Sequence, residues 1–201
     1  RRHLVTVATE HPSVLDTCRA LTSRGFELTE LAVDSNGLVS LDAVAAAIRD
    51  DTFLVSVMAA NNEIGVLQPI REIATLCHDR QVAFHTDAAQ AIGKIPIEAG
   101  GMGLDLLSVS GHKIYGPKGI GLLRVRRSGS PRLTLEPRQY GGGHEGGLRS
   151  GTLPVASIVG LARALEICLE EREAEGIRLA TLRDRLCKEI EAALPGRVLV
   201  N

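Results

Sequence analysis

The chain has 201 residues, of which 44% are hydrophobic, and its 23 basic and 24 acidic side chains leave a formal net charge of -1. This length and composition suffice for a sizeable globular core, while the balanced charge excludes an electrostatic surface for nucleic acid or an anionic membrane. No apolar run approaches the roughly 18 residues that a membrane-spanning helix needs. The cysteines form no close pairs, which favours a reducing, cytoplasmic setting over a disulfide framework.

Short apolar segments alternate with amphipathic ones along the first 125 residues. The apolar segments are continuous, as in strands covered on both faces of a sheet, and they comprise residues 4–8, 53–59, 82–86, 104–109 and 120–125. Helical patterns lie between them at residues 13–25, 41–50 and 70–80. The alternation predicts an α/β fold with a mostly parallel sheet flanked by helices.

The last third of the chain has a different pattern. After Pro154, two long helical stretches follow at residues 156–175 and 177–194, separated near Gly176. We expect a large domain over residues 1–153, then a helical connection and the start of a small domain over residues 154–201.

Both ends of the sequence shape a further expectation. The chain begins without Met, and its last five residues read as a strand just begun after a Pro-Gly turn. We interpret the sequence as an internal fragment of a larger protein. This interpretation is also compatible with an organelle-targeting peptide in the larger protein.

One lysine stands at a chemically useful position. The apolar strand LDLLSVS leads into Ser110-Gly111-His112-Lys113, so the Lys113 amine lies at the carboxyl end of a strand predicted to be buried. Open α/β sheets bind their ligands at such ends, and a partly desolvated amine is a better nucleophile. Lys113 is therefore a candidate for a carbonyl-capturing Schiff-base lysine. The alternative is a surface lysine in a turn.

An acidic residue follows another predicted strand. Asp87 ends the segment 82–86, and the small residues after it are predicted to begin a helix close to the sheet. An imine-forming lysine and a carboxylate that pairs with a protonated ring nitrogen are what a pyridoxal-phosphate site requires. An Asp between a strand and a helix is also a typical N-cap, and one residue can fill both roles.

Five segments, taken together, carry a family resemblance. In chain order they are TEHPSVLD, VMAANNEIGVLQPI, FHTDAAQAIGKI, DLLSVSGHKIYGPKGIG and GGGHEGGLRSGTLP. They resemble the motifs of the pyridoxal-phosphate-dependent cysteine desulfurases that supply sulfur for iron-sulfur cluster assembly. The similarity spans essentially the whole chain and implies the large domain of a fold type I, class V aminotransferase-like enzyme.

The resemblance implies roles for individual residues around the cofactor ring. Lys113 would bond to the cofactor aldehyde, and Asp87 would keep the ring nitrogen protonated. His11 matches a histidine that stacks on the ring and shuttles protons, whereas an isolated His is otherwise a structural, hydrogen-bonded imidazole. Asn62 and Gln90 match amides that contact the ring oxygen or the substrate carboxylate; ordinary turn and cap hydrogen bonding is the alternative.

Other matched residues concern the cofactor phosphate and the partner subunit. Ser110 and His112 correspond to phosphate-binding residues, whose hydroxyl and imidazole donors suit phosphate oxygens. Thr152 matches a threonine that reaches the phosphate from the partner subunit, which implies a homodimer. Arg149 is a candidate for pairing with a carboxylate, and the run GGGHEGG also fits a flexible loop without a ligand.

Two parts of the family pattern have no match. The sulfur-accepting cysteine lies beyond the point where this sequence stops, and the glycine-threonine loop of the phosphate cradle would precede residue 1. The four cysteines fall in helical apolar patterns and read as small core hydrophobes: Cys18, Cys77, Cys168 and Cys187. The 201 residues alone are therefore not expected to release sulfur from cysteine.

The resemblance implies that the parent protein converts L-cysteine to alanine and passes sulfur through an enzyme persulfide to an acceptor or iron-sulfur scaffold protein. A selenocysteine lyase, another transaminase-like enzyme and a catalytically inactive interaction module stay open as alternatives. The stretch GHKIYGPKG lacks the Gly-Lys-Ser/Thr ending of a nucleotide-binding loop, and no H-E-x-x-H or paired C-x-x-C predicts a metal site.

Overall fold

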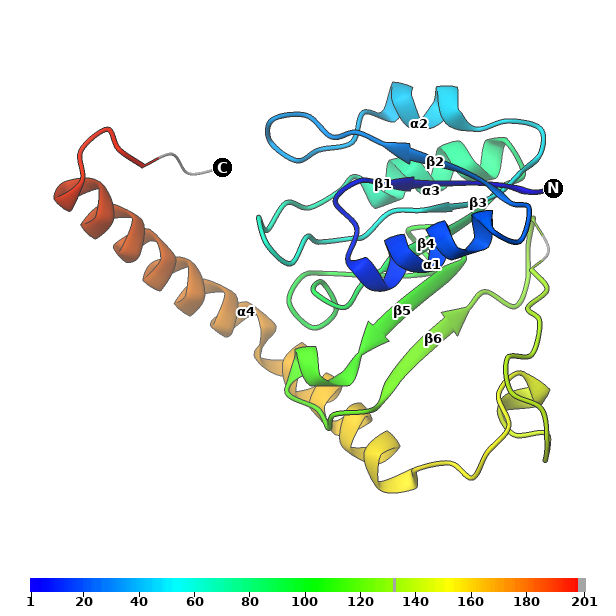
Figure 1. The fold of residues 1–201 in the computed structure, drawn as a ribbon. Helices are drawn as coiled ribbons and strands as arrows, with labels where there is room; N and C mark the ends of the chain where they lie inside the picture. Colours follow the sequence, from blue (N-terminus) through cyan, green and yellow to red (C-terminus); the bar gives the residue numbers. More distant parts are fainter. Residues whose placement is uncertain (132, 199–201) are drawn as a thin grey trace.

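A computed structural model describes residues 1–131 and 133–198 and contains a six-stranded sheet in the order β2-β1-β3-β4-β5-β6 (Figure 1). The strands are β1 (His3–Val7), β2 (Glu27–Leu31), β3 (Thr52–Ser56), β4 (Ala83–Asp87), β5 (Leu106–Ser110) and β6 (Gly121–Val125). The first five strands are parallel to one another, and β6 runs antiparallel to β5. The predicted α/β fold with a mostly parallel sheet is confirmed.

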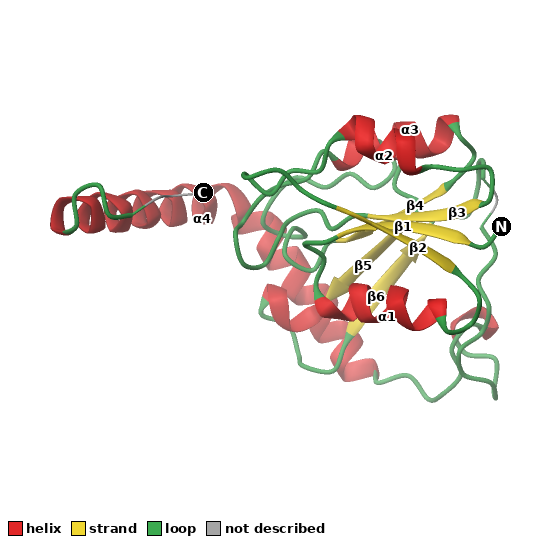
Figure 2. Ribbon diagram, turned by 45° about the horizontal axis from the view of Figure 1, so that its top comes forward, coloured by secondary structure: helices red, strands yellow, loops and turns green. Residues whose placement is uncertain are grey.

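Helices cover both faces of the sheet. The α-helices are α1 (Pro12–Thr22), α2 (Leu41–Ala47), α3 (Ile70–Asp79) and α4 (Val155–Ala193), and the 3-10 helices are η1 (Gly111–Ile114) and η2 (Glu145–Gly147). Figure 2 shows α1 on one face and α2 with α3 on the other. The chain thus reverses its winding direction at β1, and such a reversal opens a crevice at the carboxyl ends of the central strands.

The apolar core fills the space between the sheet and α3. The buried residues of α3 recur at helical spacing, namely Ile70, Ile73, Ala74 and Cys77. They join buried strand residues such as Val55 and Phe84 in one cluster. On the opposite face, α1 buries only Leu15 and Cys18.

The two edges of the sheet differ from the prediction. The strand β2 was not predicted, because its residues are exposed or half-buried and form no continuous apolar run. The strand β6 was expected to be covered on both faces, and that expectation is wrong, because Leu122 and Leu123 are exposed. Both strands lie at an edge, where burial no longer dictates the sequence pattern.

The C-terminal helix is also a correction. Two helices were predicted with a break near Gly176, but α4 runs through Gly176 as one helix of 39 residues. A glycine inside a helix costs only about 1 kcal/mol relative to alanine, and the good helix formers on both sides offset this cost. The strand predicted at the very end of the chain falls largely on residues 199–201, outside the described residues.

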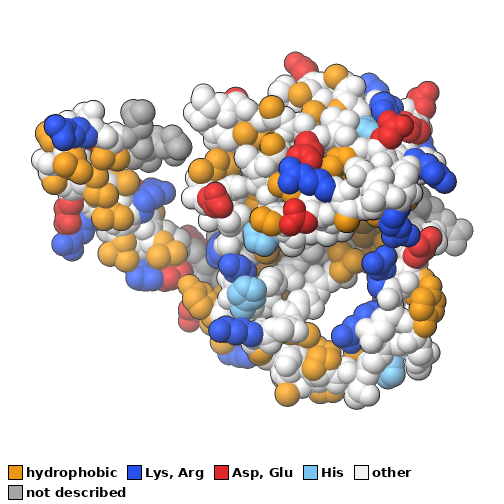
Figure 3. All heavy atoms as spheres, viewed as in Figure 1, with side chains coloured by type: hydrophobic (Ala, Val, Ile, Leu, Met, Phe, Trp, Pro, Cys, Tyr) orange, Lys and Arg blue, Asp and Glu red, His pale blue; other side chains and the backbone are white. Residues whose placement is uncertain are grey.

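The beginning of α4 packs against the segment that carries Lys113. Leu161 is buried there, and a Cβ added at Gly160 would lie 2.8 Å from Pro117 Cγ. The glycine therefore allows the helix to approach the loop after η1. Beyond this contact the helix leaves the sheet, and Figure 3 shows hydrophobic side chains along its projecting part.

A buried ionic cluster lies at the amino end of β5. The Asp105 side chain is fully buried and accepts hydrogen bonds from Phe84 N at 2.8 Å and from Arg126 Nε. His78 Nε2 of α3 lies 3.1 Å from both carboxylate oxygens. One carboxylate therefore joins β4, α3 and the strand end of β6.

The prediction that the four cysteines are buried in the core is confirmed for two of them. Cys18 and Cys77 are buried, as expected for small core hydrophobes, whereas Cys168 and Cys187 are half-buried on α4. All of them are free thiols. In the described part of the chain, no helix combines the length and the apolar character needed to cross a bilayer.

Candidate active site

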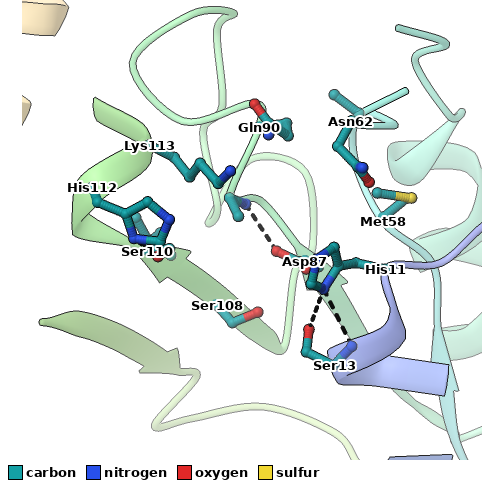
Figure 4. A pocket seen from close by; sticks show the side chains of 13 residues that line it. His11, Ser13, Met58, Asn62, Asp87, Gln90, Ser108, Ser110, His112 and Lys113 are labelled. Carbon is teal, nitrogen blue, oxygen red and sulfur yellow. Dashed lines mark hydrogen bonds between the residues drawn. The ribbon is translucent and has the colours of Figure 1, made fainter. Parts of the chain in front are cut away.

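A cavity of about 420 Å³ lies at the carboxyl ends of β1, β3, β4 and β5. This volume is in the range of small-molecule and cofactor sites. The predicted site residues that line it are His11, Asn62, Asp87, Gln90, Ser110, His112 and Lys113 (Figure 4). Sequence segments far apart in the chain are thus brought together at the crevice that the strand order creates.

Lys113 lies on η1, directly after β5. The buried Ile114 anchors this turn, and Tyr115 ends it in the left-handed conformation with φ 61°. Figure 4 shows the Lys113 amine pointing into the cavity. The predicted partial desolvation is wrong for this chain, because Lys113 is an exposed residue. The structure places the Lys113 amine at the cavity without burying the side chain.

Asp87 is the last residue of β4 and is half-buried. Its Oδ1 accepts a hydrogen bond from Ala89 N at 2.9 Å. The predicted helix after Asp87 is wrong, because residues 89–95 form turns and a bend. The carboxylate still caps the backbone of this turn, as an N-cap would, and its second oxygen is left for the cavity.

His11 is the N-cap of α1. Its Nδ1 accepts a hydrogen bond from Ser13 N at 3.2 Å and lies 2.8 Å from Ser13 Oγ. These contacts fix the ring at the helix start, where it lines the cavity (Figure 4). Because Nδ1 accepts, the ring proton resides on Nε2. A structural capping role and a position at the cavity therefore coexist in one residue.

The two amides differ in how they are held. Gln90 Oε1 accepts a hydrogen bond from Lys94 Nζ at 2.6 Å, which orients the amide at the cavity wall. Asn62 lies in the turn after β3 and lines the cavity. Its neighbour Asn61 has the turn role instead: its Oδ1 accepts from Glu63 N at 2.8 Å.

The residues assigned to phosphate binding divide into two groups. Ser110 Oγ lies 3.0 Å from His112 Nδ1, so the two side chains form a pair at the cavity rim. Thr152 is exposed and does not line the cavity, and neither does Arg149. The assignment of Thr152 to a partner subunit stays a prediction.

The cavity also involves residues that the sequence reasoning missed. Ser108 and Met58 line it, while Glu10 and His85 lie behind it. Two signals were available: Glu10 is adjacent to His11, and His85 precedes Asp87 by two positions, which places both side chains on one face of β4.

Glu10 is a buried acid behind the cavity. It is 4% exposed, its Oε1 accepts a hydrogen bond from Met58 N at 2.5 Å, and its Oε2 has no partner. Burial raises the pKa of Glu10 to about 8; the Met58 N–H opposes this rise and the nearby Asp87 charge adds to it. At neutral pH the group is therefore mostly a neutral carboxylic acid.

The raised pKa of Glu10 makes stability fall with pH. Between pH about 4.5 and about 8 the unfolded chain releases a proton that the folded chain retains. The free energy of unfolding therefore falls by up to about 1.4 kcal/mol per pH unit because of this group. Glu10→Gln keeps the acceptor for Met58 N and removes the ionisation. We expect the variant to match the parent at pH 4.5 and to be progressively more stable toward pH 8, as measured by urea unfolding.

Glu10→Leu serves as the control for this comparison. It removes the acceptor as well as the ionisation, so it is expected to be less stable than Glu10→Gln at every pH, by about 1–3 kcal/mol for the orphaned N–H. An equal stability difference between Glu10→Gln and the parent at pH 5 and pH 8 would contradict the assignment.

Comparison with known proteins shows where the chain belongs. A family model described as Aminotransferase class-V matches residues 1–199. The chain belongs to the class-V aminotransferase family. This family uses pyridoxal 5'-phosphate as its cofactor.

Two curated relatives illustrate the similarity within the class-V family. The chain is 53% identical over 193 residues to cysteine desulfurase IscS of Edwardsiella ictaluri, covering 94% of this chain and 47% of the relative. It is 51% identical over 199 residues to human cysteine desulfurase, covering 99% of this chain and 43% of the relative. The chain thus spans somewhat less than half the length of these class-V relatives.

Solved structures of class-V relatives share the fold. A NifS-like protein matches with a TM-score of 0.91 and 39% identity, covering 96% of this chain and 52% of the other. A structure described as SspA in complex with cysteine matches with a TM-score of 0.78 and 47% identity, covering 83% of this chain and 47% of the other.

Proposed function

We propose that the protein is a cysteine desulfurase that uses pyridoxal 5'-phosphate to remove sulfur from L-cysteine. The observation that carries this proposal is that an amine, Lys113, and a carboxylate, Asp87, line one cavity at the ends of neighbouring strands. Relatives above 50% identity are cysteine desulfurases, and a relative at 47% identity is described in complex with cysteine.

The side chains at the cavity fit this cofactor. The aldehyde needs an amine, which Lys113 supplies, and the ring nitrogen needs an acid partner, which Asp87 supplies. The ring face suits the His11 imidazole. The phosphate needs hydrogen-bond donors, and the paired Ser110 and His112 lie at the rim beside Lys113. The donor set therefore matches each chemical group of the cofactor.

When bound, the cofactor supplies an electron sink for the bonds of the substrate α-carbon. The chain's own residues then hold and move protons around it. The Asp87 carboxylate keeps a proton on the ring nitrogen, because a negative charge at short range favours the protonated form. The Lys113 amine would take the α-proton of the substrate and return it. The His11 imidazole, which also lines the cavity, would hold or move a proton at the bound substrate.

Asn62 and Gln90 would bind groups that need orientation without added charge. Their amides offer both donors and acceptors, so they suit the ring oxygen and the substrate carboxylate. Lys94 holds Gln90 by its Oε1, which leaves the amide N–H groups for the ligand. These residues position the substrate and take no part in proton transfer.

Substituting Asp87 in the full-length protein tests the proposal. The parent should convert L-cysteine to equal amounts of alanine and released sulfur. Asp87→Asn keeps the shape and removes the negative charge, so we expect turnover to fall by about 10²-fold or more, in line with the loss of one positioned acid–base group. Alanine and sulfide are measured in parallel.

Asp79→Asn is the matched control. This carboxylate is exposed at the end of α3 and lies outside the cavity, so the variant should turn over cysteine like the parent. Equal turnover of the parent and Asp87→Asn, or turnover of selenocysteine without turnover of cysteine, would contradict the proposal.

The wider setting is part of the same proposal. We infer that residues 1–153 form the large cofactor domain and that residues 154–201 lead into a smaller domain. The exposed Thr152 supports a homodimer, in which it would contact the cofactor phosphate of the partner subunit. The sulfur would pass to an acceptor or iron-sulfur scaffold protein, and the free thiols support a reducing, cytoplasmic setting.

A further inference from the structure

A row of polar side chains crosses three strands beneath the cavity. His85 of β4 lies between Ser56 of β3 and Ser108 of β5: its Nδ1 is 2.7 Å from Ser56 Oγ, and its Nε2 is 3.1 Å from Ser108 Oγ. The core on the α3 face of these strands is apolar. His85 lies on the opposite face from this core, and hydroxyls engage both nitrogens of its imidazole.

The row ends next to the proposed cofactor partner. Ser108 lines the cavity, and it is the register partner of Asp87 in the parallel pair of β4 and β5. Register partners in adjacent strands present their side chains on the same face. Figure 4 shows the Ser108 hydroxyl on the same side of the cavity as the Asp87 carboxylate.

The charge of Asp87 gives this row a direction. Burial lowers the pKa of His85, while Asp87 opposes this effect, so the imidazole is neutral at pH 7 and has one donor and one acceptor. A negative carboxylate favours the arrangement in which the Ser108 proton faces it. Ser108 Oγ then accepts from His85 Nε2–H, and His85 Nδ1 accepts from Ser56.

We propose that Ser56, His85 and Ser108 form a directional hydrogen-bond relay that turns the Ser108 hydroxyl proton toward the side of the cavity where Asp87 lies. In it, His85 is a positioning residue, and Ser108 is an additional residue of the cofactor site. The proposal rests on the proposed function, since it assigns Asp87 to the ring nitrogen. The relay fixes the orientation of the Ser108 hydroxyl at the cavity.

The first experiment reads the relay without the cofactor. In the cofactor-free full-length protein, labelled with ¹⁵N at histidine, long-range ¹H–¹⁵N correlation spectra report the tautomer of His85. The relay requires the neutral Nε2–H tautomer at pH 7, and Ser56→Ala is expected to reduce its population. The Nδ1–H tautomer, or an imidazolium, would overturn the proposal. This outcome does not depend on cofactor binding, so it is separable from failure of the proposed function.

The second experiment measures the effect on the cofactor. Ser108→Ala and His85→Phe are each expected to weaken binding of pyridoxal phosphate about five-fold, as for one hydrogen bond. Each should also shift the ¹⁵N resonance of the labelled ring nitrogen. The double variant should be no weaker than either single variant, because both changes break the same relay.

Ser23→Ala is the control, since this exposed hydroxyl donates to Ala20 O at the end of α1, outside the cavity. It should leave the affinity and the nitrogen resonance unchanged. Unchanged values in Ser108→Ala would overturn the relay, as would additive losses in the double variant. Because Ser108→Ala is a small change at a half-buried position, the test survives even where His85→Phe fails to fold.

Discussion

Lys113→Ala is expected to abolish the absorption band that pyridoxal phosphate acquires on joining a lysine, and to lower cysteine turnover by about 10²-fold or more. Both effects have one cause, because Lys113 supplies the amine that bonds to the aldehyde and that moves the α-proton. The absorption spectrum after incubation with the cofactor and the release of alanine from L-cysteine are the two measurements.

Lys118→Ala provides the matched control for Lys113→Ala. Lys118 is exposed in the loop after η1 and does not line the cavity, so its loss should leave both the band and turnover unchanged. A normal band in Lys113→Ala, or an equal loss in the two variants, would show that another amine does this chemistry.

Asp105→Ala is expected to destabilise the fold by about 3–5 kcal/mol, the usual effect of removing one partner from a buried ion pair. The substitution leaves Arg126 without its buried carboxylate and leaves Phe84 N without an acceptor. Chemical unfolding of the full-length protein followed by circular dichroism measures the change. Asp105→Asn, which keeps the shape, should give a smaller loss and covers the case where the alanine variant does not fold.

Asp51→Ala tests whether burial is responsible for the stability loss expected in Asp105→Ala. Arg49 Nε and Asp51 Oδ1 are 3.0 Å apart, but the two side chains are 44% and 47% exposed. An exposed pair contributes about 0–1 kcal/mol, so this variant should stay close to the parent. Equal losses at Asp51 and Asp105 would contradict the account of the buried cluster.

The fold class and the location of the site were predictable from local patterns. Asp87 and Lys113 each follow a strongly apolar strand, and parallel strands present their carboxyl ends at one edge. For that reason, residues 26 positions apart in the sequence could be expected to meet. The strand order then adds His11, because the chain reverses direction at β1 and brings the end of that strand to the same crevice.

Other features depend on interactions that a linear pattern does not report. The continuity of α4 through Gly176 is decided by the helix formers around it, and the exposure of Lys113 depends on which segments cover η1. The pairing of His85 with Ser56 and Ser108 depends on strand register. A histidine within an apolar strand signals an unusual position, but only the neighbouring strands identify its partners.

The most direct test of the account is to locate the amine that holds the cofactor. Borohydride reduces a lysine–aldehyde linkage to a stable secondary amine, so treating the full-length protein with pyridoxal phosphate and borohydride, followed by peptide mass spectrometry, identifies the modified lysine. The lysines of this chain are Lys94, Lys113, Lys118 and Lys188, and we expect stoichiometric modification of Lys113 alone. Modification at Lys94 or Lys118 with Lys113 unmodified would contradict it.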